Sequence, residues 1–217
     1  MPLSRESAFI RANTTVAAPP LVPEIRLHLA TEITPLWQGT EATLGREQLP
    51  PPYWAFAWAG GQALARHVLD HPGIVGGKRV LDFGAGSGLL ALAAAKAGAA
   101  SATAAEIDAF AAAAIAENAR LNDVAVAVER EDIIGRQPVP WEVLLVGDMC
   151  YERPLAERLT AWLRVLSYEG AIVLLGDPGR NYLPKGGLLE VARYAVPTPL
   201  DLEDRVMREG VVWRLIG

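Results

Sequence analysis

Apolar runs of strand length alternate with segments of helical spacing along most of the chain. Residues 80–83 and 141–146 are almost continuously apolar, as is typical of strands that are buried on both faces of a parallel sheet. Three more strands are predicted at residues 101–105, 124–128 and 171–175. Because helical stripes lie between them, the pattern predicts an α/β protein that is built from five strand–helix units.

The intervening segments are predicted helices because their apolar residues recur at helical spacing. They comprise residues 60–70, the run that follows Gly88, residues 110–121 and residues 154–166. Asp108 stands just before the third of these helices and is expected to be its N-cap. The tail is expected to close with a hairpin, whose strands lie near residues 202–208 and 211–216 around a turn at residues 209–210.

Residues 1–58 lack a regular pattern and are punctuated by prolines. Within them, residues 24–30 carry a short helical signal. We expect this N-terminal segment to wrap around the sheet or to cover it as a lid. With 217 residues the chain is long enough to bury one sizeable core, so we expect a single domain over residues 1–217.

The rest of the chain is organised around residues 80–97, which read as a strand, a turn with three closely spaced glycines and the start of a helix. Gly84, Gly86 and Gly88 lack a Cβ atom, so the backbone can adopt positive φ and a ligand can approach bare amides at the positive end of the helix. Their spacing differs from the dinucleotide motif G-x-G-x-x-G, which disfavours an NAD-dependent oxidoreductase. The alternative is a turn that serves only close packing of helix and strand.

Asp82 precedes these glycines and completes the pattern D-x-G-x-G-x-G. This pattern resembles the first motif of the class I S-adenosylmethionine methyltransferases. The resemblance implies a Rossmann-like α/β fold, with a seven-stranded, mostly parallel sheet and a C-terminal antiparallel hairpin. It also implies S-adenosyl-L-methionine as the cofactor, with Asp82 and the three glycines among the residues that bind it.

Two further acidic residues follow predicted strands at the edge where doubly wound sheets bind ligands. Glu106 ends the second strand and is placed to accept hydrogen bonds from both hydroxyl groups of a ribose. Asp132 follows the third strand and is the best placed acid of residues 129–132 to accept from the exocyclic amine of adenine. The alternative is that this charged run is only a solvated loop.

Four aromatic residues lie within residues 53–58, just upstream of the glycine-rich turn. We expect one of them, Trp54 or Trp58, to cover the adenine or to line the entrance for the substrate. The alternative is that these rings fill the core beside the sheet, because aromatic clusters are usually core.

The fourth predicted strand leads to Asp148 and Tyr151 at the carboxyl edge of the sheet. We expect the acceptor of the methyl group to bind here. A carboxylate at Asp148 would hold and orient an ammonium group, while the ring of Tyr151 offers an aromatic face to a cation. The alternative is a cap at the strand end and a packed ring. Residues 176–182 form a turn-rich loop at the same edge.

Composition narrows the class of protein further. The net charge of −5 argues against a broad nucleic-acid-binding surface. The lone Cys150 excludes an internal disulfide and a cysteine-based metal site, and three scattered histidines do not form a ligand cluster, so we expect no metal. No apolar stretch reaches the roughly 20 residues of a membrane span, and residues 1–13 do not resemble a secretory signal. We therefore expect a cytoplasmic protein without a membrane partner.

A narrower resemblance rests on four stretches, which are PEIRLHLATE at residues 23–32, PYWAFAWAGGQALARHVLD at 52–70, GDMCYE at 147–152 and GDPGR at 176–180. With the cofactor motif they make the chain similar to the seven-strand protein-lysine methyltransferases, and within them to the electron transfer flavoprotein β-subunit lysine methyltransferases. The resemblance places that family's D-x-x-Y motif on Asp148 and Tyr151. It places the ribose-binding acid on Glu106 and the cofactor glycines on Gly84, Gly86 and Gly88.

This resemblance implies methylation of lysine side chains on the β subunit of the electron transfer flavoprotein. The family often has Asp where this chain has Glu106 and Asn where it has Asp132. We expect no targeting segment of the kind that the mitochondrial members carry, and therefore a bacterial relative. Other acceptors that stay open are a ribosomal protein or a small amine. A D-x-x-Y motif in place of N-P-P-Y argues against methylation of a nitrogen of glutamine or adenine. A rival of another class is a non-catalytic module that binds a nucleotide or a partner.

Overall fold

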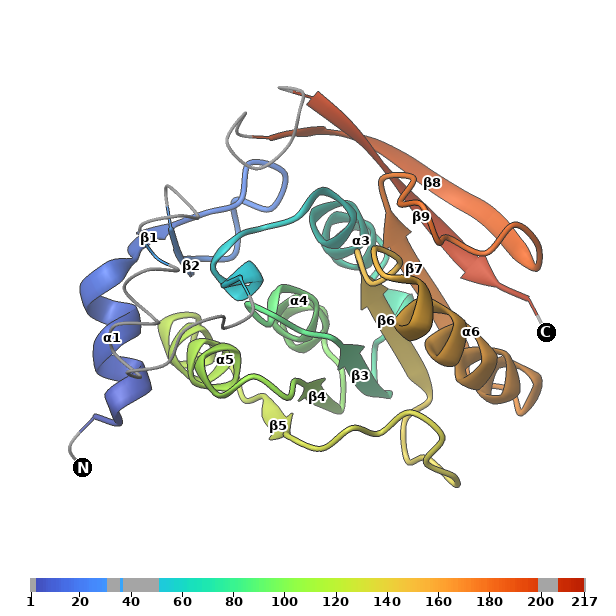
Figure 1. Ribbon diagram of the computed structural model, residues 1–217, viewed down its shortest axis with the longest axis horizontal. Helices are drawn as coiled ribbons and strands as arrows, with labels where there is room; N and C mark the ends of the chain where they lie inside the picture. The colour runs from blue at the N-terminus through green and yellow to red at the C-terminus, as the bar shows by residue number, and fades with distance from the viewer. Residues whose placement is uncertain (1–2, 31–35, 37–50, 199–206, 217) are drawn as a thin grey trace.

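The computed structural model describes residues 3–30, 36, 51–198 and 207–216. Seven strands form one sheet in the order β5-β4-β3-β6-β7-β9-β8 (Figure 1). Their bounds are β3 Arg79–Phe83, β4 Ser101–Ala105, β5 Ala127–Glu129, β6 Val143–Gly147, β7 Ile172–Asp177, β8 Leu188–Pro197 and β9 Met207–Leu215. Strands β3 to β7 are parallel, whereas β9 runs antiparallel to both β7 and β8. The predicted mostly parallel sheet with an antiparallel C-terminal hairpin is confirmed.

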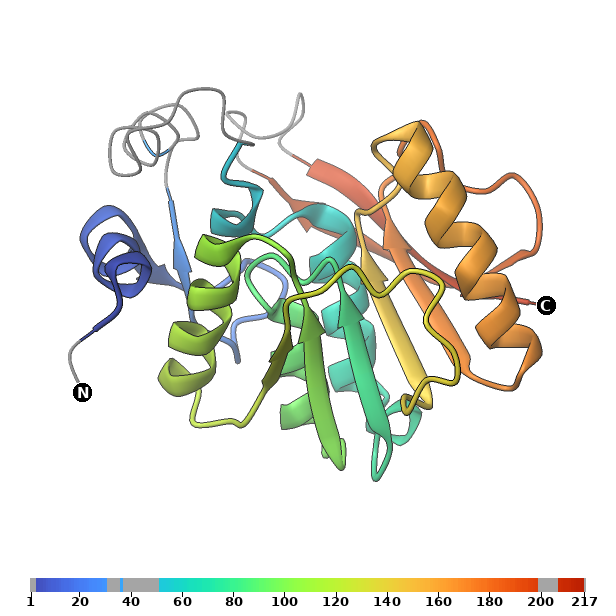
Figure 2. The same cartoon turned by 60° about the horizontal axis from the view of Figure 1, so that its bottom comes forward.

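Helices cover both faces of the sheet (Figures 1 and 2). They are α3 Ala59–Asp70, α4 Leu89–Lys96, α5 Ala109–Leu121 and α6 Arg153–Tyr168. Side chains of the central strands alternate between the faces: Leu145 packs with α3 and α4, while its neighbour Leu144 packs with α6. Each such buried leucine contributes about 2 kcal/mol relative to an exposed one. The apolar runs of the central strands therefore serve two cores at once.

The predicted strand–helix units are present, with shifts at some ends. Asp108 caps α5 as predicted, because its Oδ1 accepts the backbone N–H groups of Phe110 and Ala111. The third strand is shorter than predicted and begins at Ala127. Its first expected residue, Val124, instead donates its N–H to the carbonyl of Ala119, in the turn that closes α5.

The helix that was predicted at residues 24–30 is wrong. The chain makes a turn there and then forms β2, Leu27–Leu29, which pairs antiparallel with β1, Thr15–Ala17. Ile25 and Leu27 are fully buried while Arg26 between them is exposed, so these three successive side chains alternate in direction. The backbone N–H groups of Arg26 and His28 donate to the side chains of Asn122, the C-cap of α5, and Asn118 of α5, so they need no helical partners.

The N-terminal segment is more regular than its prolines indicate. A helix, α1 Arg5–Asn13, begins at the N-cap Ser4 and packs against α5, where the rings of Phe9 and Phe110 lie edge to face at 5.2 Å. A short 3-10 turn, η1 Tyr53–Ala55, follows before α3. Residues 31–35 and 37–50 lie outside the described residues, so a lid over the sheet stays a prediction.

The closing hairpin is formed by other residues than predicted. Residues 202–206 lie outside the described residues, and the hairpin's first strand is β8. Gly210 is not a turn residue, since it sits inside β9 opposite Tyr194. A Cβ atom at this position would lie 2.5 Å from the Cβ of Ala63 and 2.8 Å from the carbonyl oxygen of Ala59. Glycine is therefore required because α3 crosses β9 at very short range.

We expect Gly210→Ala to lower the free energy of unfolding by about 1–3 kcal/mol, because the added methyl group meets backbone and Cβ atoms that cannot rotate away. Urea denaturation at neutral pH measures this change. Gly73→Ala is the matched control, since nothing lies within 4 Å of a Cβ at Gly73, and its effect should stay within about 0.5 kcal/mol. Equal stability of both variants would contradict the close packing of α3 on β9.

Candidate active site

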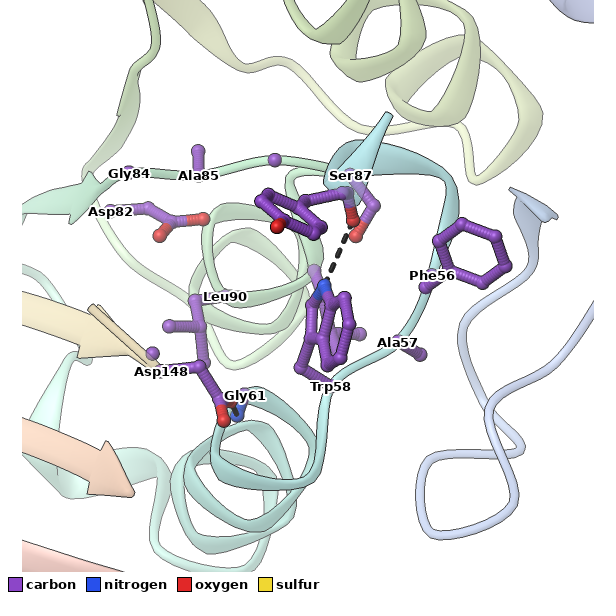
Figure 3. A pocket seen from close by; sticks show the side chains of 14 residues that line it. Phe56, Ala57, Trp58, Gly61, Asp82, Gly84, Ala85, Ser87, Leu90 and Asp148 are labelled. Atoms are coloured by element: carbon purple, nitrogen blue, oxygen red, sulfur yellow. Dashed lines mark hydrogen bonds between the residues drawn. The ribbon is translucent and has the colours of Figure 1, made fainter. Parts of the chain in front are cut away.

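The carboxyl ends of β3, β4 and β6 open into a large cavity. Its volume is about 810 Å³, within the range of small-molecule sites. A smaller cavity of about 60 Å³ adjoins it, and Figure 3 shows its lining. Both are lined by Tyr53, Trp58, Gly84, Gly86, Gly147 and Asp148. Of the predicted site residues, all except Gly88 line one or both cavities.

The glycine-rich turn joins β3 to α4 in a conformation that strongly favours glycine. Gly84, Gly86 and Gly88 have φ values of 64°, 52° and 80°. A Cβ atom at Gly84 would lie 2.3 Å from the sulfur of Met149, and one at Gly88 would lie 3.1 Å from Ile115. Gly84 and Gly86 thus leave bare backbone at the cavity wall, whereas Gly88 permits α4 to start against α5.

Asp82 lies beneath this turn and is almost fully buried, with 1% of its surface exposed. Its Oδ2 accepts the N–H of Ala91 at 2.9 Å, in the first turn of α4. Gly88 has no side chain to cap this helix, so Asp82 supplies the cap from β3. Burial raises the pKa of Asp82 to about 7. Asp82 also lines the smaller cavity, where it contributes a carboxyl group (Figure 3).

Glu106, the residue after β4, also holds the glycine-rich turn. Its Oε2 accepts the N–H of Gly86 at 2.9 Å and its Oε1 accepts the N–H of Asp108 at 3.0 Å. Burial raises the pKa of the Glu106 carboxyl. Each carboxylate oxygen retains acceptor capacity beyond these two bonds, and Glu106 lines the large cavity. The position agrees with a carboxylate that binds hydroxyl groups of a ligand.

Asp132 lines the large cavity and is exposed in the loop that follows β5. Its Oδ2 accepts from Arg158 at 2.9 Å, and its Oδ1 accepts the N–H of Ile134. The Arg158 guanidinium holds the pKa of Asp132 below its usual range. The neighbouring Glu129 and Glu131 pair with Arg136. Glu129 ends β5, whereas Glu131 and Asp132 are exposed in the loop that follows it, and the contact of Asp132 with adenine stays a prediction.

The aromatic residues before α3 divide between core and cavity. Trp54 is 3% exposed and packs with Phe56 and Phe110 in a core cluster, although it also borders the large cavity. Trp58 lines both cavities, and its Nε1–H donates to the carbonyl of Tyr53 at 2.9 Å. Tyr53 was not predicted as a site residue. Its ring lies edge to face against Trp58, with a centroid distance of 5.6 Å.

Asp148 follows β6 with a φ of 57°, the left-handed conformation that few residues other than glycine adopt. Its Oδ2 accepts the N–H of Gly61, in the first turn of α3, at 2.8 Å. A Cβ atom on Gly60 would lie 2.2 Å from the carbonyl oxygen of Gly176, so glycine brings α3 close to the strand ends. The positive end of the α3 dipole thus faces the Asp148 carboxylate.

Arg180 was not predicted as a site residue, yet it contacts Asp148 directly. Its Nη2 and Nε donate to Oδ1 of Asp148 at 3.0 and 3.3 Å. Burial raises the pKa of Asp148 to about 6, while the Arg180 guanidinium opposes this shift and Asp177 adds to it. The turn-rich GDPGR loop at the same sheet edge was the signal that pointed to this region.

Tyr151 stands beside Asp148 on the wall of the large cavity and is 46% exposed. Its ring lies edge to face against Tyr53 with centroids 6.1 Å apart. Burial raises the pKa of its phenol, so the hydroxyl stays protonated at neutral pH. The fold therefore brings Asp148, Tyr151, Trp58 and Glu106 to the wall of one cavity.

Two absences hold for the described residues. Residues 3–30, 36, 51–198 and 207–216 contain no group of three or more His, Cys, Asp or Glu side chains arranged to hold a metal ion. Among the helices formed by these residues, none combines the length and apolar character that crossing a membrane requires. Cys150 is buried, and burial raises the pKa of its thiol to about 12.

Comparison with known proteins identifies the family. The chain is 38% identical to the electron transfer flavoprotein beta subunit lysine methyltransferase of Xenopus laevis, over 95% of this chain and 85% of that protein. It is 36% identical to the human protein of the same name, over 95% of this chain and 80% of that protein. Residues 64–142 also match the family described as ribosomal protein L11 methyltransferase (PrmA).

Solved structures share the fold at lower identity. Ribosomal protein L11 methylase from Lactobacillus delbrueckii subsp. bulgaricus superposes with a TM-score of 0.52 at 22% identity, over 75% of this chain and 81% of that one. Magnesium protoporphyrin IX methyltransferase from Synechocystis PCC 6803, with bound SAM, gives a TM-score of 0.53 at 15% identity, over 70% and 78%. The fold is that of the class I methyltransferases, and by its sequence the chain belongs to the family of electron transfer flavoprotein beta subunit lysine methyltransferases.

Proposed function

We propose that this protein transfers methyl groups from S-adenosylmethionine to lysine side chains of the β subunit of the electron transfer flavoprotein. One observation carries the proposal: a buried carboxylate, Asp148, and an aromatic side chain, Tyr151, share a cavity with the glycine-rich turn and Glu106. A methyl donor and a cationic side chain would thus meet in one place. Identity of 35–38% to vertebrate proteins with this activity in their names supports the same substrate.

The residues of the large cavity fit the cofactor. Gly84 and Gly86 present bare backbone to the cavity, and the Glu106 carboxylate would accept from the ribose hydroxyls. Asp132 would accept from the adenine amine, with Trp54 at the cavity border. Bound S-adenosylmethionine supplies a methyl group on a sulfonium, which is already an activated leaving group. Asp82 would act indirectly, because it caps α4 below the turn.

The acceptor end of the cavity would bind and orient the lysine. A lysine ammonium has a reference pKa near 10.4, so the nitrogen must lose a proton before it can attack. With a pKa of about 6, Asp148 is mostly ionised at neutral pH and would hold the ammonium in place. The face of Tyr151 would contact the same cation. No histidine occurs among the described residues that line either cavity, so we expect the proton to pass to water.

Mass spectrometry tests the proposal. A purified bacterial flavoprotein β subunit is incubated with the protein and S-adenosylmethionine, and we expect mass increases of whole methyl groups on lysine. Ribosomal protein L11 is the competing acceptor, because residues 64–142 match that methyltransferase family. A small amine is included as a third acceptor. Methylation of L11 or of the amine, with the β subunit unmodified, would overturn the substrate proposal. A location in the cytoplasm likewise stays a prediction.

A further inference from the structure

We infer that Arg180 is a positioning residue, which keeps the Asp148 carboxylate ionised and oriented for the acceptor lysine. This inference rests on the proposed function, because it assigns Asp148 the task of binding the lysine ammonium. Arg180 follows β7 in the loop 178–187, so it reaches Asp148 from a different strand end. It adds a residue to the acceptor end of the cavity that lies outside the D-x-x-Y motif.

The guanidinium of Arg180 is held from several sides. Two of its nitrogens, Nη2 and Nε, bond Oδ1 of Asp148 at 3.0 and 3.3 Å. Its central carbon lies 5.5 Å from the ring centroid of Trp58, in cation–π contact. Asp177 fixes the loop itself, since its Oδ1 accepts the N–H groups of Gly179 and Arg180 at 2.7 and 2.6 Å. The cation is therefore built into the cavity wall.

Without a cation at this place, Asp148 would tend to bind a proton. The carboxyl is 9% exposed, and the nearby acid Asp177 is also buried, with its Oδ2 lacking a hydrogen-bond partner. Both conditions favour the neutral form of Asp148. Among the described residues, the titratable and charged groups around Asp148 include Arg180 and Asp177 from β7 and its loop, and Cys150 from the loop before α6. Asp82 from β3 shares the small cavity with Asp148, and Tyr151 shares the large one.

The sign of the pH effect follows from these charges. An opposite charge at this distance lowers the pKa of a carboxyl by roughly 1–3 units, and the pKa of Asp148 is about 6 with Arg180 in place. Removal of Arg180 would therefore bring the pKa of Asp148 to neutrality or above. The carboxylate would then be lost at the pH at which the wild type binds lysine.

The test is the pH dependence of kcat/KM for the β subunit between about pH 5 and pH 9. Because the lysine must lose a proton, log kcat/KM rises with pH with a slope of one. Below the pKa of Asp148 the slope is two, because that carboxyl must lose a proton as well. We expect this break near pH 6 in the wild type and higher by about 1–3 pH units in Arg180→Gln. Arg180→Lys keeps the charge and should return the break toward the wild-type position.

Arg158→Gln is the matched control, because Arg158 also pairs with an aspartate at the wall of the same cavity, at 2.9 Å. Its break should not move. Affinity for S-adenosylhomocysteine, measured by calorimetry, should be the same in Arg180→Gln and wild type. If Arg180→Gln lowers kcat/KM but the slope changes at the same pH as in the wild type, the inference is overturned and Arg180 is a structural residue. A lower KM with a higher rate would also overturn it, since Arg180 would then compete with the lysine.

Failure of the proposed function is distinguishable from failure of this inference. If no acceptor is methylated, the pKa of the Asp148 carboxyl is still measured by carbon-detected NMR titration of wild type and Arg180→Gln. A higher pKa in the variant supports the electrostatic role of Arg180 whatever the acceptor is. An equal pKa in both proteins overturns it.

Discussion

Asp148→Asn is expected to lower kcat/KM for lysine methylation by about 100-fold, while the protein stays folded and retains its affinity for S-adenosylhomocysteine. A hydrogen bond to a charged group contributes about 1.5–3 kcal/mol, and each 1.4 kcal/mol is a factor of ten. Asparagine removes the charge, and its single side-chain oxygen can accept from Gly61 only with the NH₂ group turned toward Arg180. It also tolerates the φ of 57°, which alanine would not. Steady-state methylation of the β subunit, with calorimetry of cofactor product binding, measures both quantities.

Asp123→Asn is the control for this substitution. Among the residues that the structure describes, Asp123 is the other non-glycine residue with a positive φ, at 54°. It follows α5 and lines neither cavity. The same chemical change at the same backbone conformation should leave kcat/KM unchanged. Wild-type activity in Asp148→Asn would remove the acceptor role from this carboxylate, and loss of activity in both variants would point to a general effect on folding.

Glu106→Gln is expected to raise the Kd for S-adenosylhomocysteine by about 10–100-fold. Both oxygens of Glu106 already accept backbone N–H groups, from Gly86 and Asp108. A carboxylate has acceptor capacity left for the ribose hydroxyls, whereas the amide of glutamine would turn its NH₂ group toward one of these donors. The substitution therefore weakens the cofactor contact and disturbs the glycine-rich turn together. Isothermal calorimetry measures the affinity.

The matched control is Glu131→Gln, because Glu131 lines the same cavity but has a side chain that is 78% exposed. Its Kd should equal that of the wild type. The affinity of the wild type should also fall on acidification. Burial raises the pKa of Glu106, so its carboxylate is lost at a higher pH than an ordinary glutamate. Equal Kd values for Glu106→Gln and Glu131→Gln would exclude Glu106 from the cofactor site.

Local sequence patterns predicted the structure correctly wherever a residue's neighbours in the chain decide its conformation. The alternation of apolar and polar segments predicted the strand–helix units, because buried strands and amphipathic helices have different periods. Asp108 was predicted as an N-cap, and it is one, because capping depends on the next two or three residues. The pattern from Asp82 to Gly88 predicted a turn that requires glycine, and its three positive φ values confirm that turn.

Contacts between distant segments decided the rest. Residues 24–30 form a turn and a strand because Asn118 and Asn122, far along the chain, bind their backbone. In the sequence Gly210 indicates a hairpin turn, but the structure requires glycine there because α3 crosses β9 closely.

At the acceptor end of the cavity, too, the sequence predicted some residues and contacts between distant segments decided the others. The sequence by itself placed Asp148 and Tyr151 at the carboxyl edge of the sheet, since parallel strands end there. Only the tertiary structure brought Arg180 from the next strand end onto Asp148 and Trp58. It also decided the pKa of Asp148, because burial and the charges of Arg180 and Asp177 depend on packing between segments that no local pattern contains.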